Sequence, residues 1–312
     1  MSTLPAPPTA HCAYDYAQVN VFAERPLEGN QLAVFADARG LTADEMQSLA
    51  RETNLSETTF ILPREPEIEK KHGVRVRIFT TQEELPFAGH PTLGTASWVY
   101  WNHPVFAGNE TITLDLGVGP ITVRFTPSQP NQHGVFGTMQ QNDPIFGLQD
   151  HDRGALASLL GFNLQDLDAN LPVQMVTTGN PFCIVPLKTL DAMRGLALPR
   201  TAKLSEYLAR CKAKFFYFIT RSEPATGAQW HARMQFYNGE DPATGSAAGP
   251  AIAYLVRHQA VPSGKTIIIE QGVEMLRPSR LHVSAKISGD KVSDVFVGGR
   301  TIPVAIGRFF LP

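Results

Sequence analysis

The sequence predicts an α+β protein of two homologous halves, each of which wraps a sheet around one buried helix. Two observations lead to this fold class. Short strand and helix patterns follow one another in the same order in each half. Matching short segments also recur at separations between 150 and 159 residues, as expected for an internal repeat. A chain of 312 residues is long enough for two domains of ordinary size.

The first half begins with a Pro- and Ala-rich segment, residues 1–12, which is expected to be a loose tail. Strands are predicted at residues 19–22, 31–36, 58–62 and 74–80, and a hairpin at 111–116 and 120–125. Residues 42–53 are expected to form an amphipathic helix, with Thr42 as N-cap and Glu45 at the capping-box position. Residues 91–101 are apolar almost all round, which is typical of a buried helix.

The second half repeats this order. Strands are predicted at residues 173–177, 182–186, 215–220, 231–237, 265–270, 281–286 and 292–297. Helices are predicted at 201–212 and 242–257, and the second has few polar residues. Pro250 lies inside this second helix, where it should remove a hydrogen bond and kink or shorten the helix.

The strongest repeat lies at the starts of the two buried helices. His90-Pro91-x-x-Gly94-Thr95-Ala96 matches Asp241-Pro242-x-x-Gly245-Ser246-Ala247, 151 residues later. Each segment places a proline just inside the expected helix start, followed by small residues. A helix N-terminus carries unpaired N–H groups and partial positive charge, so each start suits a carboxylate. Two such starts facing each other would bind one ligand between the domains.

Four side chains in or near these segments are candidates for chemistry. Glu57 lies between a helix and an apolar strand, where desolvation would raise its pKa toward the range for proton transfer. His90, Asp241 and Ser246 occupy the matched helix starts. Each has a structural alternative: a solvated glutamate, a hydrogen-bonded loop histidine, an N-cap aspartate and a small packing residue.

Composition excludes several classes of partner. The net charge of -2 argues against nucleic-acid or anionic-membrane binding by bulk electrostatics. No apolar run approaches the ~20 residues needed to span a bilayer, and the N-terminus does not resemble a signal peptide. The three cysteines have wide spacings, which favours a reducing cytoplasm over disulfides or zinc. No nucleotide-binding or metal-binding motif occurs, so neither a cofactor nor a metal is expected.

Seven segments, in one order along nearly the whole chain, resemble the PhzF (phenazine biosynthesis-like) family. They are GNQLAVF (29–35), LARETNLSETTFIL (49–62), RIFTTQEELPFAGHPTLGTA (77–96), TGNPF (178–182), EDPATGSAAG (240–249), QGVEMLRPSR (271–280) and FVGGRTIPV (296–304). The resemblance implies two pseudo-symmetric domains of the diaminopimelate-epimerase fold, each a mainly antiparallel curved sheet around a central helix. We expect one domain at 1–128, joined by the C-terminal strand 300–312, and the other at 129–299.

The resemblance also implies a site between the domains. In the family's phenazine enzyme a glutamate of the SET motif moves a proton during isomerisation of a dihydro-hydroxyanthranilate, and it corresponds to Glu57. The catalytic candidates are therefore Glu57, His90 and Asp241. The candidate substrate-binding residues are Gly89, Gly245, Ser246, Asn30 and Asn180. The expected protein is a cofactor-independent isomerase acting on a small amino- or hydroxy-carboxylate, and a homodimer.

Two alternatives compete with this reading. Related epimerases of the same fold use two thiols, but residues 86–96 and 239–249 contain no cysteine, and Cys183 is better interpreted as a core residue. The chain could instead be a non-catalytic binding protein that keeps the cleft, because fold does not establish function. Together, the four intact candidate side chains favour an enzyme.

Overall fold

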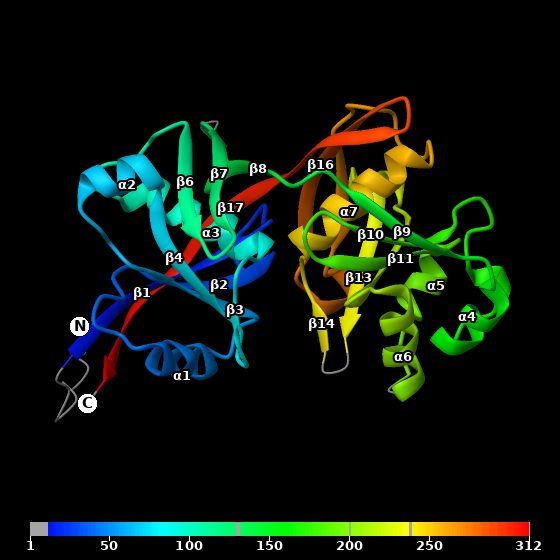
Figure 1. The fold of residues 1–312 in the computed structure, drawn as a ribbon, viewed down its shortest axis with the longest axis horizontal. Coiled ribbons are helices and arrows are strands. Elements are labelled where there is room, and N and C mark those ends of the chain that lie inside the picture. The colour runs from blue at the N-terminus through cyan, green and yellow to red at the C-terminus, as the bar shows by residue number, and fades with distance from the viewer. Residues whose placement is uncertain (1–11, 129–131, 200, 237–238, 312) are drawn as a thin grey trace.

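The computed structural model describes residues 12–128, 132–199, 201–236 and 239–311. Figure 1 shows two lobes, with the long final strand β17 (Lys291–Leu311) running from one to the other. Among the described residues, no helix is long and apolar enough to cross a membrane. The protein is sheet-rich with added helices, which confirms the predicted α+β class.

The strands of the first lobe form a closed series. They are β1 (Cys12–Val21), β2 (Asn30–Phe35), β3 (Glu57–Ile61), β4 (Val74–Phe79), β6 (Thr111–Leu116), β7 (Gly119–Thr126) and β8 (Val135–Gln140). The two-residue strand β5 (Glu84–Leu85) pairs with β4. β17 pairs with β8 and, further on, with β1, so it closes the ring.

The second lobe has a comparable series. Its strands are β9 (Ile145–Asp150), β10 (Val173–Thr177), β11 (Pro181–Pro186), β12 (Phe215–Arg221), β13 (Trp230–Phe236), β15 (Ile267–Gln271) and β16 (Ser279–Ser288), followed by the start of β17. The short strand β14 (Gly239–Asp241) pairs antiparallel with β13. Parallel pairing occurs at β2–β3 and β4–β6, and again at β11–β12 and β13–β15, whereas the other pairs between named strands are antiparallel.

One helix in each lobe is mostly buried. These are α3 (Gly89–Asn102), with ten of fourteen residues buried, and α7 (Gly245–Arg257), with eleven of thirteen. A Cβ atom added at Gly94 of α3 would lie 2.6 Å from the Leu32 side chain on β2. The close contact of α3 with the sheet therefore requires glycine at this position.

The remaining helices lie nearer the surface. They are α1 (Ala43–Thr53), α2 (Pro66–His72), α4 (Arg153–Leu160), α5 (Leu190–Arg194), α6 (Ala202–Cys211) and the 3₁₀ turns Leu164–Asp166, Pro224–Thr226 and Val273–Met275. The predicted capping box of α1 is confirmed, because Thr42 accepts from the amide of Glu45 and the Glu45 carboxylate accepts from that of Thr42.

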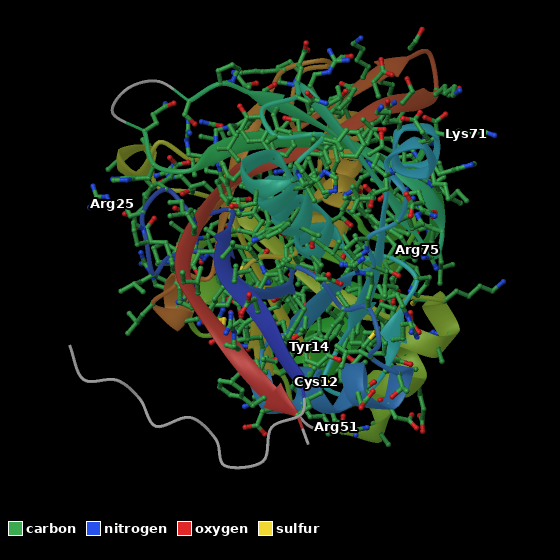
Figure 2. All side chains as sticks on the ribbon, turned by 90° about the vertical axis from the view of Figure 1, so that its left-hand side faces the viewer. Cys12, Tyr14, Arg25, Arg51, Lys71 and Arg75 are labelled. Carbon is green, nitrogen blue, oxygen red and sulfur yellow. The ribbon has the colours of Figure 1, made fainter. Side chains whose placement is uncertain are left out.

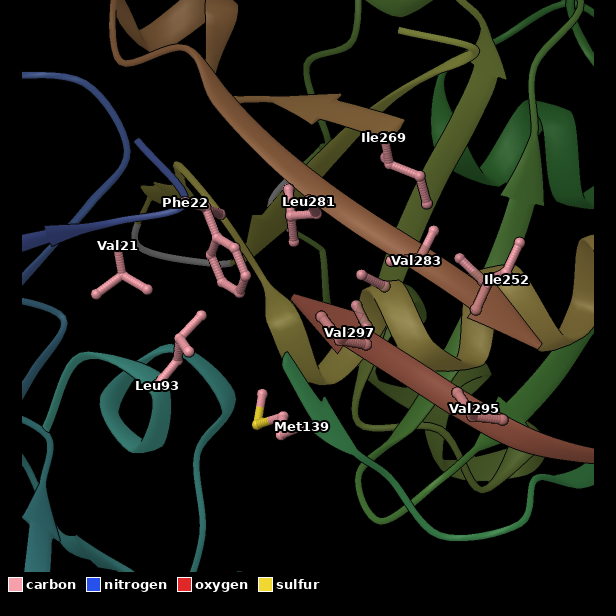
Figure 3. Close-up of a cluster of buried hydrophobic side chains, with 14 of the residues drawn as sticks. Val21, Phe22, Leu93, Met139, Ile252, Ile269, Leu281, Val283, Val295 and Val297 are labelled. Carbon is pink, nitrogen blue, oxygen red and sulfur yellow. The ribbon is translucent and has the colours of Figure 1, made fainter. Parts of the chain in front are cut away.

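The main hydrophobic core continues between the lobes. In Figure 3, Val21, Phe22, Leu93 and Met139 of the first lobe lie on one side of it, and Ile252, Leu281 and Val297 continue it into the second. Phe22 is fully buried although its φ is 61°, a left-handed conformation that is costly for an aromatic residue. Its ring packs closely against Gly299 of β17 and Gly245 of α7, where an added Cβ atom would lie 2.5 and 3.0 Å from it.

Several predicted boundaries are wrong. Cys12 belongs to β1 and pairs with Leu311, and Figure 2 places it beside the end of β17, so residue 12 is not part of a loose tail. Residues 1–11 and position 237 of the predicted strand 231–237 lie outside the described residues. The strand expected at 292–297 extends over the 21 residues of β17 because both lobes supply pairing partners for it.

The two helix starts also differ from the prediction. α3 begins at Gly89, so His90 lies in its first turn rather than in a loop. α7 begins at Gly245 with Thr244 as N-cap, so Pro242 is outside the helix and Asp241 ends β14. The α7 helix continues through Pro250 to Arg257, so the proline does not shorten it. Packing on all sides compensates for the missing hydrogen bond.

Candidate active site

The site is centred on Glu57, the first residue of β3. The residues after it are buried, and its own side chain is 17% exposed. Its Oε2 atom lies 3.5 Å from Nε2 of His90 in the first turn of α3. The structure therefore places the glutamate of the SET segment against the histidine of the GHP segment, and the alternative of a solvated Glu57 is wrong.

Asn30, at the start of β2, connects this pair to Asp241. Its Nδ2 atom donates to Oδ1 of Asp241 at 2.7 Å and to the carbonyl of Ala243 at 3.0 Å, and lies 3.2 Å from Nδ1 of His90. The Asn30 side chain is 1% exposed. One buried amide thus holds together side chains of the two lobes that are 151 residues apart in sequence.

Asp241 has a second donor. The hydroxyl of Thr244 donates to its Oδ2 atom at 2.6 Å. Its carboxylate therefore caps no helix, and the alternative of an N-cap Asp241 is wrong. Instead, both of its oxygens accept hydrogen bonds from neighbouring side chains.

Burial sets the protonation states. It raises the pKa of Glu57 to about 8, with a further increase from the negative charge of Asp241. Burial lowers the pKa of His90 to about 3, although a hydrogen bond with the Gln31 backbone opposes this. At neutral pH the close contact of Glu57 with His90 therefore joins two uncharged groups, and His90 is not the charged donor that a protonated ring would provide.

Asp241 differs from Glu57 in the same surroundings. Burial raises its pKa to about 6, but the hydrogen bonds from Thr244, Asn30 and the Ala243 backbone limit the increase. Asp241 is therefore mostly ionised at neutral pH. Because the pKa values of these two carboxyl groups differ, one group can transfer a proton while the other stays negatively charged.

The starts of α3 and α7 lie against each other. A Cβ atom added at Gly89 would lie 2.9 Å from the amide nitrogen of Ser246, and one added at Gly245 would lie 3.0 Å from the Phe22 ring. The amides of the first two residues of each helix have no intrahelical acceptor. Hence the absence of side chains at these two glycines lets two sets of N–H groups converge.

The other predicted substrate-binding residues are placed differently. Ser246 lies in the first turn of α7 and is partly exposed. Asn180 lies in the turn between β10 and β11, also partly exposed, and among the described residues its side chain makes no hydrogen bond to Asn30, His90 or Asp241. The repeat equates Asn180 with Asn30, but only Asn30 joins the cluster.

Sequence reasoning missed the residues that support the cluster. Gln271, at the end of β15, bonds to the backbone and side chain of Thr244 and to the carbonyl of Asp241. Gln141 donates to the carbonyl of Gly245 and accepts from Thr178. Gln271 is the first residue of QGVEMLRPSR, one of the segments that resemble the family. That resemblance could have identified it as a candidate site residue.

Two surface cavities lie elsewhere in the second lobe. One of about 1060 Å³ lies between β9, α4 and α6, and one of about 910 Å³ lies beside α6 and β14. Glu57, His90 and Asp241 line neither. In the part of the chain that the structure describes, no three His, Cys, Asp or Glu side chains are grouped to hold a metal ion.

Comparisons with known proteins identify the family of this chain. Residues 19–307 match the phenazine biosynthesis-like protein family, PhzC-PhzF. The trans-2,3-dihydro-3-hydroxyanthranilate isomerase of Pseudomonas aeruginosa is 36% identical over 95% of this chain and 99% of its own length. The solved structure of a predicted epimerase from the same species is 33% identical with a TM-score of 0.79, covering 96% of this chain and all of that one.

A more distant structure shares the fold. The Bacillus anthracis phenazine biosynthesis protein of the PhzF family is 24% identical, with a TM-score of 0.83 over 96% of this chain and all of that one. The family match covers most of the chain, and the relatives are similar along their full length. This protein therefore belongs to the phenazine biosynthesis-like (PhzC-PhzF) family and is an isomerase.

Proposed function

We propose that this protein is a cofactor-independent isomerase that moves a proton on a small carboxylate bound between its two lobes. The observation that carries the proposal is the contact of Glu57 with His90, 3.5 Å apart, in surroundings that raise the pKa of Glu57 to about 8. General acid–base groups work best when their pKa lies near the working pH.

Glu57 is the proposed proton carrier. A single group that moves a proton from one carbon to another must accept the proton before it donates it, so its ionised form starts the reaction. A raised pKa makes the ionised carboxylate a stronger base toward a carbon acid. His90 has a free Nε2 atom near Glu57 and would orient that carboxyl or the substrate.

The substrate carboxylate is proposed to bind at the two helix starts. The amides of Gly89 and Ser246 lie in the first turns of α3 and α7, and the hydroxyl of Ser246 adds a donor. Asp241 is ionised and would repel a lone carboxylate, so the ligand should also carry an amino or hydroxyl group to face it. Asn30 donates to Asp241 and to the carbonyl of Ala243 and lies against His90, which supports a positioning role.

The relatives' substrate has the required groups. Trans-2,3-dihydro-3-hydroxyanthranilate, after which the Pseudomonas enzymes are named, combines a carboxylate with an amino and a hydroxyl group. It is therefore the first compound to test, followed by other cyclic and open-chain amino and hydroxy acids.

We further propose two pseudo-symmetric domains, 1–128 with 300–312 and 129–299, each around a central helix. The parallel pairs at corresponding places in the two strand series support this division. A cytoplasmic homodimer stays a prediction, and light scattering at micromolar concentration that gives one chain mass would refute the dimer.

The function is tested by following proton exchange in deuterated water. The compounds are trans-2,3-dihydro-3-hydroxyanthranilate and a set of other cyclic and open-chain amino and hydroxy acids. We expect deuterium incorporation and isomerised product, both unaffected by EDTA. Saturable binding without exchange would support the non-catalytic binding protein instead. Activity that disappears with EDTA and returns with a divalent metal would contradict the metal-free part of the proposal.

A further inference from the structure

We propose that Gln271 is a positioning residue that fixes the Thr244 hydroxyl as a hydrogen-bond donor to Asp241. Gln271 lies outside the candidate catalytic set, at the end of β15, and is fully buried. Its effect on the reaction rests on the function proposed above. Its effect on the Asp241 carboxyl does not, because that follows from the hydrogen bonds themselves.

The side-chain amide of Gln271 uses its full hydrogen-bonding capacity. Its Nε2 atom donates to the carbonyl of Asp241 at 2.7 Å and to Oγ1 of Thr244 at 2.9 Å. Its Oε1 atom accepts from the amide of Thr244 at 3.2 Å and from the hydroxyl of Tyr217 at 3.0 Å. An amide has two donor hydrogens and two acceptor sites, and all four are occupied here.

The orientation of this amide is determined by its partners. The carbonyl of Asp241 can only accept a hydrogen bond, and the amide of Thr244 can only donate one. Nε2 must therefore face Asp241 and Oε1 must face the Thr244 amide. An amide rotated by 180° would place two acceptors together and two donors together.

This orientation fixes the direction of the Thr244 hydroxyl. Since Nε2 of Gln271 can only donate, Oγ1 of Thr244 accepts that hydrogen bond, and its own single hydrogen is directed to Oδ2 of Asp241 at 2.6 Å. Accepting from a protonated Asp241 through the remaining lone pair of Oγ1 would direct the hydroxyl hydrogen away from Oδ2, its only acceptor among the described residues. A fixed donor favours the ionised carboxylate over the neutral acid.

Other charged and titratable groups act on Asp241 as well. Glu240 precedes it on β14, Glu57 lies across the site on β3, His90 lies on α3, and Tyr217 approaches from β12. Glu57 and Glu240 disfavour a second negative charge when they are ionised. The donors from Thr244 and Asn30 offset this, and Gln271 keeps the first of them in place.

The test measures the pKa of Asp241 directly, by carboxyl ¹³C NMR titration of protein labelled at aspartate. Asp241→Asn identifies the resonance. Thr244→Val removes the donor, Thr244→Ser retains it, and Gln271→Met removes the residue that orients it. Tyr217→Phe removes one partner of Gln271 that makes no hydrogen bond to Asp241. Circular dichroism and thermal unfolding establish that each variant is folded. The pH dependence of kcat/KM is measured in parallel.

We expect the Asp241 pKa to rise by about one unit in Thr244→Val, because a hydrogen bond to a charged group is lost. A smaller rise is expected in Gln271→Met, with near-normal values in Thr244→Ser and Tyr217→Phe. An unchanged pKa in a folded Thr244→Val or Gln271→Met variant would overturn the proposal. So would an equal rise in Thr244→Ser and Thr244→Val, which is decisive if Gln271→Met does not fold.

The kinetic data separate the two proposals. If kcat/KM has a second inflection below that of Glu57 that moves with the NMR value of Asp241, both the positioning role of Gln271 and the catalytic role of Asp241 are supported. The NMR shifts could appear as expected while the wild-type protein turns over none of the acids. The positioning role of Gln271 would then be supported, and the proposed isomerase function would be refuted.

Discussion

His90 and Asp241 are joined by a single side chain, because Nδ2 of Asn30 lies 3.2 Å from Nδ1 of His90 and donates to Oδ1 of Asp241 at 2.7 Å. The two joined residues come from α3 in one lobe and β14 in the other. A change in the relative position of the lobes must therefore alter these contacts. This relationship makes Asn30 as important to the site as the residues proposed to carry out the chemistry.

Replacing Glu57 tests the proton carrier. Glu57→Gln keeps the shape of the side chain and removes its titrating group, so we expect normal folding and a rate lower by about two to four powers of ten. Glu52→Gln, at an exposed position near the end of α1, is the control and should retain full activity. Near-normal isomerisation by Glu57→Gln would refute the assignment.

The pH profile tests which form of Glu57 starts the reaction. If the ionised form is the base, kcat/KM should rise with pH through about 8, the raised pKa of Glu57. Asp241→Asn removes the negative charge that contributes to this pKa, so any residual activity should show the same limb at lower pH. A profile that falls through about 8 would indicate that the protonated acid acts first.

Asn30 can be compared with its repeat partner. Asn30→Ala removes a donor to a buried carboxylate, and we expect a loss of about 1–3 kcal/mol in the free energy of unfolding together with reduced activity. Asn180→Ala should change the stability by less than about 0.5 kcal/mol, because its side chain has no contact with the cluster. Urea denaturation measures both, and equal effects would contradict the role given to Asn30.

Glycine at position 89 permits the two helix starts to meet. In Gly89→Ala the new methyl group would lie 2.9 Å from the amide nitrogen of Ser246, so α3 and α7 must separate. We expect a marked rise in KM, since the amides proposed to bind the carboxylate move apart. Gly154→Ala in α4 meets nothing closer than 4.0 Å and should be neutral or slightly stabilising. An unchanged KM in Gly89→Ala would refute this use of the helix starts.

His231 tests a buried charge network away from the candidate site. Burial disfavours the charge on His231, but the hydrogen bonds that its ring donates to Glu270 and Glu274, at 3.1 and 2.9 Å, outweigh it and raise the pKa to about 9. His231→Gln leaves the buried Glu270 and the half-buried Glu274 without the cation between them, so we expect a loss of about 3–5 kcal/mol at pH 7. Lys70→Ala, which breaks the exposed pair with Glu67, should cost less than about 1 kcal/mol.

The raised pKa of His231 also predicts that the stability of the protein depends on pH. The folded-state pKa of His231 lies above its unfolded value of about 6.5. Its contribution is therefore complete below about pH 6.5 and is lost as the pH rises through about 9. The difference in unfolding free energy between wild type and His231→Gln should shrink over that range. A constant difference from pH 6 to pH 10 would show that the histidine is uncharged in the folded protein.

Local patterns in the sequence were sufficient for much of the fold. The helix α1 with its Thr42 cap, the β6–β7 hairpin and the two buried helices depend on periodicity and capping between near neighbours. The predicted ends of strands and helices were wrong where residues distant in sequence determine them. β17 continues over both lobes because β16, β8 and β1 each pair with it, and α7 begins after Pro242 because Asp241 is held by Asn30 and Thr244.

The sequence by itself determined the class of fold and indicated the titratable candidates Glu57, His90 and Asp241, since these lie in short motifs with the family's spacing. Only the tertiary structure decided the protonation states of these residues and the hydrogen bonds that hold them in place. Burial separates the pKa values of Glu57 and Asp241, and burial is a property of the packed chain. Asn30 and Gln271 acquire their roles in the same way, from hydrogen bonds that span 211 and 30 residues and that no local pattern encodes.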